Sequence, residues 1–260
     1  MDLQLEKKTA IVTGAGRGIG LAITRRLALE GARVVANTRE DTGDLTRLAD
    51  ADEDVLVVVG DVTDPATPQR LVDAAEARVD IVVNNAGVAP ARPGGFLEIT
   101  DADWQATFAL DLFAALSVIR AALPAMLGAG AGSVVNVGSI NARLPDPMVL
   151  DYSAAKAALA NATKSLSKAY GRHGIRFNSV DPGPVATDLW NGEHGVARTI
   201  SATGAGTPEE IAARAAEAMP TGRFSQPDEV ATLVVMLASP VLGNITGASF
   251  VIDGGMQPSL

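Results

Sequence analysis

Seven short runs of the sequence are almost continuously apolar and rich in Val and Ile. They cover residues 10–12, 33–37, 55–59, 81–83, 133–137, 175–180 and 249–252. Apolar and polar residues alternate along a strand with one face in solvent, whereas a strand buried on both faces gives an unbroken apolar run. We therefore predict a parallel sheet that is covered by helices on both faces.

Longer segments with helical periodicity lie between these runs. They predict helices over residues 19–29, 65–77, 101–127, 152–170, 208–218 and 227–237. Gly31 and Gly174 stand where C-terminal caps are expected. The alternation of strands and helices predicts a doubly wound α/β fold, and no linker or repeat divides residues 1–260, so we expect a single domain.

Residues 188–220 break this rhythm, because the segment is polar and glycine-rich. A long excursion after a late strand often forms a lid over a site, so we expect a substrate loop or lid here; the alternative is a surface insertion. Leu189 and Trp190, with Met148 and Leu150, would supply apolar walls and favour a hydrophobic ketone or alcohol, although ordinary packing explains them equally well. His194 is expected to be a solvated loop residue.

Composition narrows the function further. The chain has no cysteine, which excludes a disulfide scaffold, a thiolate zinc site and a cysteine nucleophile, and only two histidines, which argues against a metal site. A net charge of −9 opposes nonspecific nucleic-acid binding. The charged start lacks a signal-peptide core, and no apolar run approaches the roughly 20 residues that span a bilayer. These features predict a soluble cytoplasmic protein with no membrane or nucleic-acid partner.

A glycine-rich turn, Thr13-Gly14-Ala15-Gly16-Arg17-Gly18-Ile19-Gly20, follows the first predicted strand and opens the first predicted helix. Residues without side chains permit positive φ and let a pyrophosphate approach the backbone, and a helix N-terminus adds free N–H groups. The spacing departs from G-x-G-x-x-G, because Ile19 stands where that pattern has glycine. In its place between strand and helix, the turn predicts a binding site for cofactor phosphates.

The end of the second strand indicates which nicotinamide cofactor is preferred. An acidic residue there would bind the ribose 2′-hydroxyl and repel a 2′-phosphate, but Thr38 occupies the position. Arg39 follows it, and Arg17 lies in the glycine-rich turn, so two guanidiniums are available for a phosphate. We therefore favour NADP(H) over NAD(H). The alternative is that Arg39 only pairs with Glu40 or Asp41 in solvent.

Tyr152 and Lys156 are four residues apart at a predicted helix start, so they share one face. Lowering the pKa of a tyrosine from about 10 by two or three units takes about 3–4 kcal/mol, and an ammonium about 4 Å away supplies about that much at an effective dielectric near 20. Such a pair beside a nicotinamide makes an acid–base group. A tyrosine and a lysine four residues apart are also common on exposed helices. The pair therefore indicates catalysis only if it lies beside the nicotinamide site.

Ser139 ends the fifth predicted strand, thirteen residues before Tyr152. Open α/β sheets bind ligands at the C-terminal ends of their strands, where a serine hydroxyl can hold a substrate carbonyl oxygen. A nucleophilic serine would need a G-x-S-x-G elbow, which this sequence lacks. A serine that only caps the strand end is the other alternative.

Together these residues resemble the classical short-chain dehydrogenase/reductase family over residues 7–255. The motifs that carry the resemblance are Thr13-Gly14-x-x-x-Gly18-Ile19-Gly20, Asp61-Val62, Asn84-Asn85-Ala86-Gly87, Ser139, Tyr152-x-x-x-Lys156, Pro182-Gly183-Pro184-Val185-x-Thr187 and Asp253-Gly254-Gly255. The resemblance implies one Rossmann-like dinucleotide-binding catalytic domain with a seven-stranded parallel sheet. It implies hydride transfer between a nicotinamide cofactor and a small carbonyl or alcohol substrate, in a homotetramer or homodimer.

The resemblance also implies a role for each matched residue. Tyr152 would be the acid–base group, Lys156 would bind the nicotinamide ribose and lower the tyrosine pKa, and Ser139 would position the substrate oxygen. The remaining cofactor contacts would come from Gly14, Arg17, Gly18, Ile19 and Gly20 for the phosphates, Thr38 and Arg39 for the ribose, Asp61 and Val62 for adenine, Asn85, Ala86 and Gly87 for the nicotinamide ribose, and Pro182, Gly183, Val185 and Thr187 for the carboxamide.

One departure concerns Asp111, which stands where the family usually has a fourth catalytic residue, an asparagine. Its negative charge would oppose the field of Lys156 at Tyr152, so we predict a raised tyrosine pKa and an alkaline-shifted rate profile. Asp111 also supports an alternative, a regulatory protein that binds the cofactor but has lost catalysis. An NAD-dependent alcohol dehydrogenase is a second alternative. Asp181, where the family often has an apolar or small residue, has no explanation in the sequence.

Overall fold

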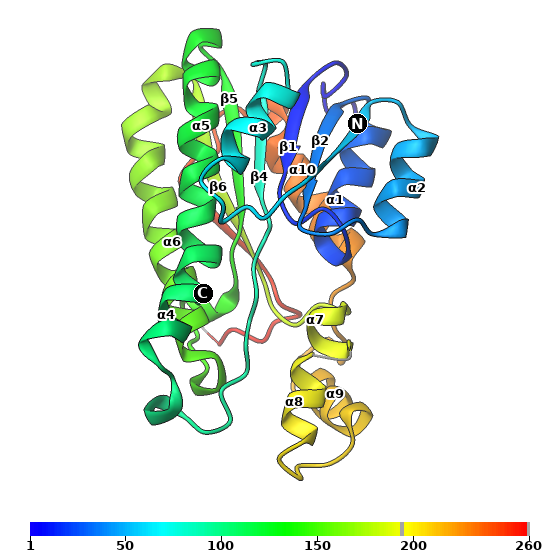
Figure 1. Ribbon diagram of the computed structural model, residues 1–260, viewed down its shortest axis with the longest axis vertical. Helices are drawn as coiled ribbons and strands as arrows, with labels where there is room; N and C mark the ends of the chain where they lie inside the picture. The colour runs from blue at the N-terminus through cyan, green and yellow to red at the C-terminus, as the bar shows by residue number, and fades with distance from the viewer. Residues whose placement is uncertain (193–194, 259–260) are drawn as a thin grey trace.

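A computed structural model describes residues 1–192 and 195–258. At its centre lies a sheet of seven parallel strands in the order β3-β2-β1-β4-β5-β6-β7 (Figure 1). The strands are β1 (Thr9–Val12), β2 (Arg33–Thr38), β3 (Val55–Val59), β4 (Ile81–Asn84), β5 (Gly132–Val137), β6 (Ile175–Pro182) and β7 (Ser249–Ile252). The predicted fold class is confirmed, and each strand ends within two residues of its predicted limits.

Helices cover both faces of the sheet. They are α1 (Gly18–Leu29), α2 (Gly43–Ala51), α3 (Thr67–Ala74), α4 (Asp101–Phe108), α5 (Ala114–Ala129), α6 (Leu150–Tyr170), α7 (Asp188–Asn191), α8 (Val196–Ser201), α9 (Pro208–Glu217) and α10 (Pro227–Ala238). Helices α1, α2 and α10 pack on one face, and α3, α5 and α6 pack on the other. Short 3-10 turns span Phe96–Glu98, Ile140–Ala142, Pro147–Val149, Gly171–His173 and Pro240–Leu242.

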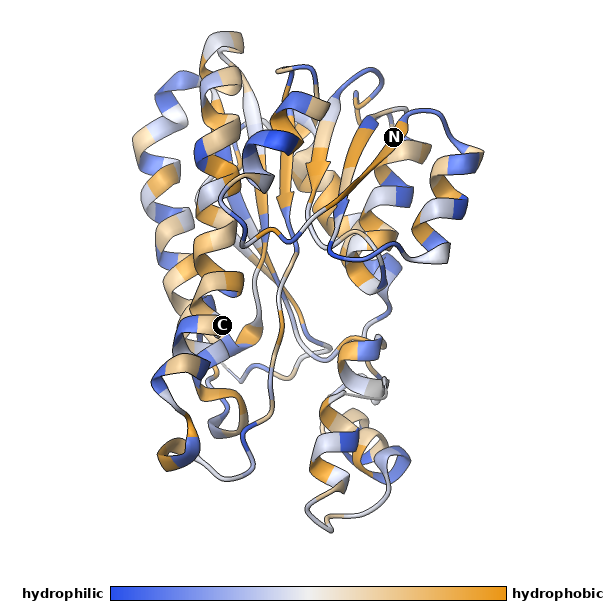
Figure 2. Cartoon of the chain, in the orientation of Figure 1, coloured by the Kyte–Doolittle hydropathy of each residue, from blue (hydrophilic) through white to orange (hydrophobic). Residues whose placement is uncertain are grey.

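The core consists of two apolar layers, one on each face of the sheet. Figure 2 shows the hydrophobic residues gathered on the strands and on the helix faces turned toward them. The four residues of β1 and of β4 are all buried, whereas the edge strands β3 and β7 are partly exposed. The central strands therefore show the unbroken apolar runs expected of strands covered on both faces, whereas the equally apolar β3 lies at an edge and leaves Leu56 and Val59 exposed.

Three helices differ from the prediction. Helix α2 was not predicted, because polar residues interrupt its nine-residue segment, which buries only Leu45. Helix α3 is shorter than the predicted 65–77, since Glu76 and Ala77 adopt left-handed φ values of +54° and +56° that end it. The predicted helix 101–127 is interrupted by a π-helical turn over Ala109–Phe113, which separates α4 from α5.

The same run, Asp101–Ala129, is long and apolar enough to cross a bilayer by length and composition. The expectation that no such segment exists is therefore wrong. In this molecule α5 packs against β4, β5 and α3, and it buries the face that carries Val118, Ile119 and Met126. These core contacts account for the buried part of its apolar surface, and 39% of the run's most apolar stretch is buried.

Because all seven strands are parallel, the loops after β1, β2, β4, β5 and β6 emerge at the same edge of the sheet. Helices α7, α8 and α9 lie beyond this edge and pack mainly on one another (Figure 1). The predicted helix 208–218 corresponds to α9. Helices α7 and α8 were not predicted, because each is too short to show a helical periodicity in the sequence. His194 lies outside the described residues.

Candidate active site

The loops that follow β1 and β4 are joined through Thr13 and Asn85. The hydroxyl of Thr13 accepts hydrogen bonds from the backbone N–H groups of Asn85 (3.0 Å) and Ala86 (3.1 Å). In return, the Asn85 amide donates to the carbonyl oxygens of Thr13 and Gly14, both at 3.0 Å. Sequence reasoning treated Thr13 only as the start of the glycine-rich turn, because its partner lies 72 residues away.

The glycine-rich turn has no space for side chains. Gly14 and Gly18 have φ values of +65° and +54°, and a Cβ on Gly14 would lie 2.9 Å from Cα of Ala86. A Cβ on Gly20 would collide with the carbonyl oxygen of Gly14. Ile19 packs on the core beneath the turn. The turn therefore presents backbone at the start of α1, which fits the predicted phosphate-binding role.

The two arginines proposed for a 2′-phosphate are exposed, but the structure pairs each with an acid. The guanidinium of Arg39 donates to Glu40 from Nη2 (2.9 Å) and Nε (3.2 Å). Arg17 Nη1 lies 3.9 Å from the carboxylate of Asp188 at the start of α7. Thr38 is buried, and its hydroxyl donates to the carbonyl oxygen of Glu40 at 2.6 Å. Surface pairs of this kind are worth about 0–1 kcal/mol, so a phosphate can displace them.

Asp61 and Val62 follow β3 at the same edge. The Asp61 carboxylate accepts hydrogen bonds from the hydroxyl (2.7 Å) and the N–H (2.8 Å) of Thr63, which hold its pKa below the ordinary value. Val62 is buried in the core layer that contains α3. Of the two residues, only Asp61 is exposed.

Ser139, Tyr152 and Lys156 come together where β5 ends and α6 begins. Ser139 is buried directly after β5, and its hydroxyl accepts from the N–H of Asn141 at 3.2 Å. The side chain of Lys156 runs back under Tyr152, with Nζ 5.5 Å from the centre of the tyrosine ring. Lys156 Nζ also donates to the carbonyl oxygen of Val137 at 3.1 Å. The pairing of Tyr152 with Lys156 is therefore part of the structure and not an exposed helix motif.

Asp111 reaches the same cluster from the π-helical turn. Its Oδ1 lies 3.3 Å from Lys156 Nζ, and its Oδ2 accepts from the N–H of Val88 at 3.3 Å. The carboxylate is buried, and Oδ1 has no hydrogen bond of good geometry among residues 1–192 and 195–258. A Cβ on Gly87 would lie 2.5 Å from this oxygen and 3.3 Å from Lys156 Nζ, so Gly87 leaves room for the pair.

Opposing charges act on Tyr152. Burial raises the pKa of its hydroxyl; Lys156 lowers it, Asp111 raises it again, and the net direction is upward. This upward direction agrees with the raised tyrosine pKa that the Asp111 charge predicts, and Lys156 alone does not offset burial. Burial would lower the pKa of Lys156, but the Asp111 carboxylate raises it, so the lysine stays charged. Burial raises the pKa of Asp111, and Lys156 opposes that shift.

Asp181 is a further buried carboxylate near this cluster. It accepts hydrogen bonds from the hydroxyls of Ser179 (2.9 Å) and Ser249, and Arg143 Nη1 lies 3.9 Å away. These donors and Arg143 stabilise the buried Asp181 carboxylate near the end of β6, which accounts for an acidic residue at this position. Its charge also acts to raise the pKa of Tyr152.

The segment after β6 passes close to the glycine-rich turn. A Cβ on Gly183 would lie 2.9 Å from that of Asp253, and a Cβ on Gly18 would lie 3.2 Å from Cγ2 of Thr187. Val185 is buried in the core layer beside α1 and α10. Pro182 ends β6, so the predicted carboxamide-binding segment lies along the same edge as the turn.

Two cavities lie near these residues, but neither is lined by Ser139, Tyr152 or Lys156. One of about 460 Å³ is bordered by Asn141, Ala142, Pro145, Asp146, Pro147, Leu150, Ser153, Ala154 and Ala157. The other, of about 180 Å³, lies in the loop after β4. Of the predicted apolar walls, Leu150 lines the larger cavity, and Trp190 packs on Phe224 with ring centres 5.0 Å apart.

Comparison with known proteins agrees with this arrangement. A family model described as enoyl-(acyl carrier protein) reductase matches residues 14–257. The D-threitol dehydrogenase of Mycolicibacterium smegmatis is 36% identical over 98% of this chain and 94% of its own length. The cis-4-hydroxycyclohexanecarboxylate dehydrogenase of Sinomonas cyclohexanicum is 38% identical over 96% of each chain. The L-sorbose reductase of Gluconobacter frateurii, solved with NADPH and L-sorbose, superposes with a TM-score of 0.91 and 31% identity over the full length of both chains.

The chain therefore belongs to the short-chain dehydrogenase/reductase family. It is an oxidoreductase that acts on alcohol or ketone groups and uses a nicotinamide cofactor, as this family does.

Proposed function

We propose that this protein transfers a hydride between NADP(H) and a small carbonyl or secondary alcohol, with Tyr152 as the acid–base group. The observation that supports it most directly is the placement of Lys156, which is buried under the Tyr152 ring and held by Val137. A buried ammonium beside a phenol has a direct effect on its acidity. The glycine-rich turn lies at the same edge of the sheet.

Each side chain has a defined part in this reaction. The Ser139 hydroxyl holds the substrate oxygen, and the Tyr152 hydroxyl gives a proton to it during reduction or takes one from it during oxidation. Lys156 keeps a positive charge under the ring and stabilises the phenolate form of Tyr152. Asn85, Ala86 and Gly87, with the turn at Gly14, would hold the cofactor. When bound, the nicotinamide supplies or accepts the hydride.

The preference for NADP(H) rests on the end of β2. Thr38 leaves the position without the carboxylate that selects an unphosphorylated ribose. The exposed guanidiniums of Arg39 and Arg17 are held only by weak surface pairs. A 2′-phosphate forms stronger, charge-assisted hydrogen bonds with arginine than an exposed carboxylate does with the same group. NAD(H) use would require Glu40 or another acid to take the ribose hydroxyls.

The relatives suggest that the substrate is hydroxylated. They act on D-threitol, L-sorbose and a hydroxycyclohexanecarboxylate, according to their names. In this chain Asn141 and Arg143 follow Ser139 closely and bring polar groups toward the same edge. We therefore propose a small polyol, ketose or hydroxylated ring as substrate. The hydrophobic ketone suggested by Leu189 and Trp190 stays an alternative prediction, as does a lid formed by residues 188–220.

The test begins with a titration of the purified protein by NADPH and NADH, followed by fluorescence. A panel of D-threitol, L-sorbose, 4-hydroxycyclohexanecarboxylate and hydrophobic ketones is then assayed with the preferred cofactor. NADPH preference with turnover of a hydroxylated substrate supports the proposal. Preference for NADH would shift the assignment to an NAD-dependent alcohol dehydrogenase. Binding of neither cofactor would overturn the proposal.

Assembly as a homotetramer or homodimer stays a prediction from the family resemblance. A cytoplasmic location stays a prediction from the composition of the sequence.

A further inference from the structure

Arg92 lies in the loop between β4 and α4 and ties that loop to the start of α6. Its Nη2 donates to Asp151 at 2.6 Å, its Nε contacts the same carboxylate at 3.4 Å, and its Nη1 donates to Asp103 at 2.9 Å. The backbone N–H of Arg92 also donates to the carbonyl oxygen of Met148 at 2.7 Å. Backbone and side chain therefore hold the same two segments together.

Asp151, the acceptor of these bonds, directly precedes Tyr152 and is fully buried. It also accepts a hydrogen bond from the hydroxyl of Thr107 in α4 at 2.7 Å. Burial alone would raise the pKa of Asp151, but hydrogen bonds from Arg92 and Thr107 hold it below its ordinary value. A buried, ionised carboxylate with directional donors from two other segments fixes the backbone that carries it.

Tyr152 is thus anchored on both sides along α6. On one side Thr107 and Arg92 hold Asp151, and on the other Asp111 contacts Lys156. Thr107 precedes the π-helical turn and Asp111 lies within it, so one continuous run supplies both contacts. These two anchors hold the stretch of α6 that carries Tyr152.

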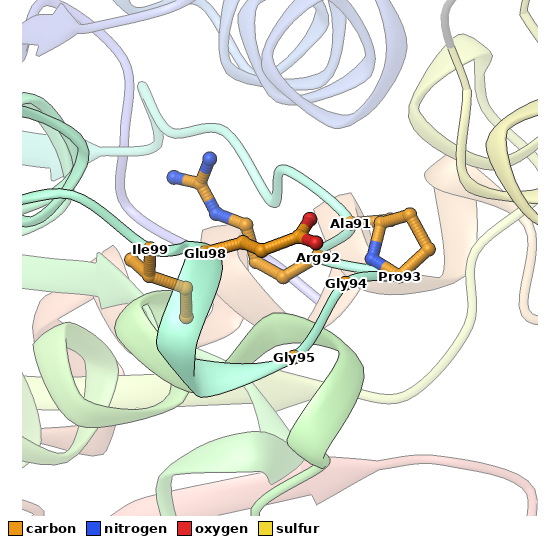
Figure 3. Close-up of a pocket in the computed structure, with 7 residues that line it drawn as sticks. All are labelled: Ala91, Arg92, Pro93, Gly94, Gly95, Glu98 and Ile99. Atoms are coloured by element: carbon orange, nitrogen blue, oxygen red, sulfur yellow. The ribbon is translucent and has the colours of Figure 1, made fainter.

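The surroundings of Arg92 do not form a ligand site. The pocket of about 180 Å³ in Figure 3 is small compared with ligand pockets, which usually exceed about 300 Å³. It is lined by Ala91, Arg92, Pro93, Gly94, Gly95, Glu98 and Ile99. The Arg92 guanidinium points away from the Pro93 ring, and two carboxylates neutralise it. An anionic ligand would have to break both ion pairs.

We propose that Arg92 is a positioning residue for Tyr152, and that it acts through Asp151. This inference rests on the proposed function, because it has meaning only if Tyr152 performs the acid–base step. Arg92 sets the start of α6 and neutralises a carboxylate one residue from the reacting hydroxyl. Other charged groups facing Asp151 from packed elements are Asp103 and Asp111, and Lys156 lies one turn further along α6.

The first experiment compares wild type, Arg92→Met and Arg92→Lys with the best substrate of the panel above. We expect Arg92→Met to lower kcat roughly 10- to 100-fold, because small displacements of a catalytic group have effects of this size. The Kd for NADPH is expected to stay within about twofold, since Arg92 does not touch the glycine-rich turn. Arg92→Lys restores part of kcat, because an ammonium keeps the charge but cannot fork to two carboxylates.

A matched control is Arg33→Met. Arg33 forms an ion pair with Glu76 at 2.9 Å at the opposite edge of the sheet. The Arg33→Met variant also removes an arginine and an ion pair of similar length, but far from Tyr152. Its kcat is therefore expected to equal that of wild type. If Arg92→Met does not fold, Arg92→Lys and Asp151→Asn carry the same test.

The pH profile separates positioning from a purely structural role. In the reduction direction Tyr152 donates a proton, so kcat falls as the pH rises above its pKa, and this fall is the alkaline limb of the profile. Arg92→Met leaves the Asp151 carboxylate buried without its counter-ion, so we expect the alkaline limb to move to higher pH. The double variant Arg92→Met/Asp151→Asn removes the carboxylate charge, and the alkaline limb is expected to return toward wild type. A merely structural loss would change the melting temperature of both variants without moving the limb.

Two results would overturn the inference: wild-type kcat and pH profile in Arg92→Met, or a loss of kcat matched by an equal loss of NADPH affinity. The proposed function fails separately, if Tyr152→Phe turns over like wild type. A Tyr152→Phe variant that is inactive beside a fully active Arg92→Met rejects only the role of Arg92.

Discussion

The Asp111 carboxylate lies 3.3 Å from the ammonium of Lys156, and both side chains are buried beneath Tyr152. A buried pair of this kind is strongly coupled, because neither charge is screened by water. Lys156 favours the phenolate form of Tyr152, and Asp111 opposes it. Burial, together with these two opposing charges, sets the direction in which the pKa of Tyr152 is shifted.

Asp111→Asn should shift the rate profile to lower pH. In the proposed alcohol oxidation Tyr152 acts as a base, so activity is expected to rise as pH passes its pKa. Removing the Asp111 charge removes one of the groups that raise this pKa, and the rising limb then moves acidward. The measurement is kcat/KM against pH in the oxidation direction. The exposed Asp50→Asn on α2 is the matched control, and an unmoved profile for both variants would show that Tyr152 does not sense Asp111.

Tyr152→Phe should abolish turnover while cofactor binding persists. Loss of a positioned acid–base group lowers rates by about 10²- to 10⁴-fold. The phenyl ring keeps the packing over Lys156, so NADPH titration and melting temperature should stay close to wild type. A protein that only binds cofactor in a regulatory role would have no turnover in either form, so the comparison also tests that alternative.

Arg39→Ala should weaken NADPH far more than NADH. A charge-assisted hydrogen bond contributes about 1.5–3 kcal/mol, which corresponds to a loss of roughly 10- to 100-fold in NADPH affinity. Calorimetric titration with each cofactor gives the ratio. Arg47→Ala on α2 is a suitable control, because Arg47 is an exposed arginine paired with Asp44. Equal weakening of both cofactors would show that Arg39 does not contact a 2′-phosphate.

Gly87→Ala should disrupt the Asp111–Lys156 pair and reduce kcat. The new methyl group would stand 2.5 Å from Oδ1 of Asp111, so the carboxylate must move. We expect a fall in melting temperature, since overpacking destabilises by about 1–3 kcal/mol. Gly128→Ala is the matched control: in the part of the chain that the structure describes, no atom other than those of its chain neighbours and the adjacent backbone of α5 lies within 4 Å of its added Cβ. That variant should instead stabilise α5 slightly, and identical behaviour of the two would contradict the steric argument.

Sequence reasoning located the strands and the glycine-rich turn because their signals are local. Unbroken apolar runs and the four-residue spacing of Tyr152 and Lys156 require no knowledge of distant segments. The anchors around Asp151 escaped it, because Arg92 and Asp151 are 59 residues apart and meet only after β4, α4 and α6 pack. The π-helical turn at Ala109–Phe113 also has no local signal, since its pattern matches an ordinary helix.

The cofactor arginines illustrate the same limit. Their residue types and spacing suggest a joint phosphate site, but the structure pairs Arg39 with Glu40 and Arg17 with Asp188. The partner of an exposed guanidinium is set by free-energy differences of less than about 1 kcal/mol between alternative ion pairs. A pattern of residue types does not contain that information.

Helices α7, α8 and α9 pack mainly on one another beyond the edge of the sheet. Mutations within them therefore act mainly on this segment itself, except at Asp188, which contacts Arg17 of the glycine-rich turn. The segment beyond Asp188 can thus be exchanged while the residues proposed for proton transfer stay in place. We expect a chimera carrying the corresponding segment of a threitol or sorbose relative to keep the fold of the parent, and a shift of its substrate preference toward that of the donor would support the proposed substrate role of residues 188–220.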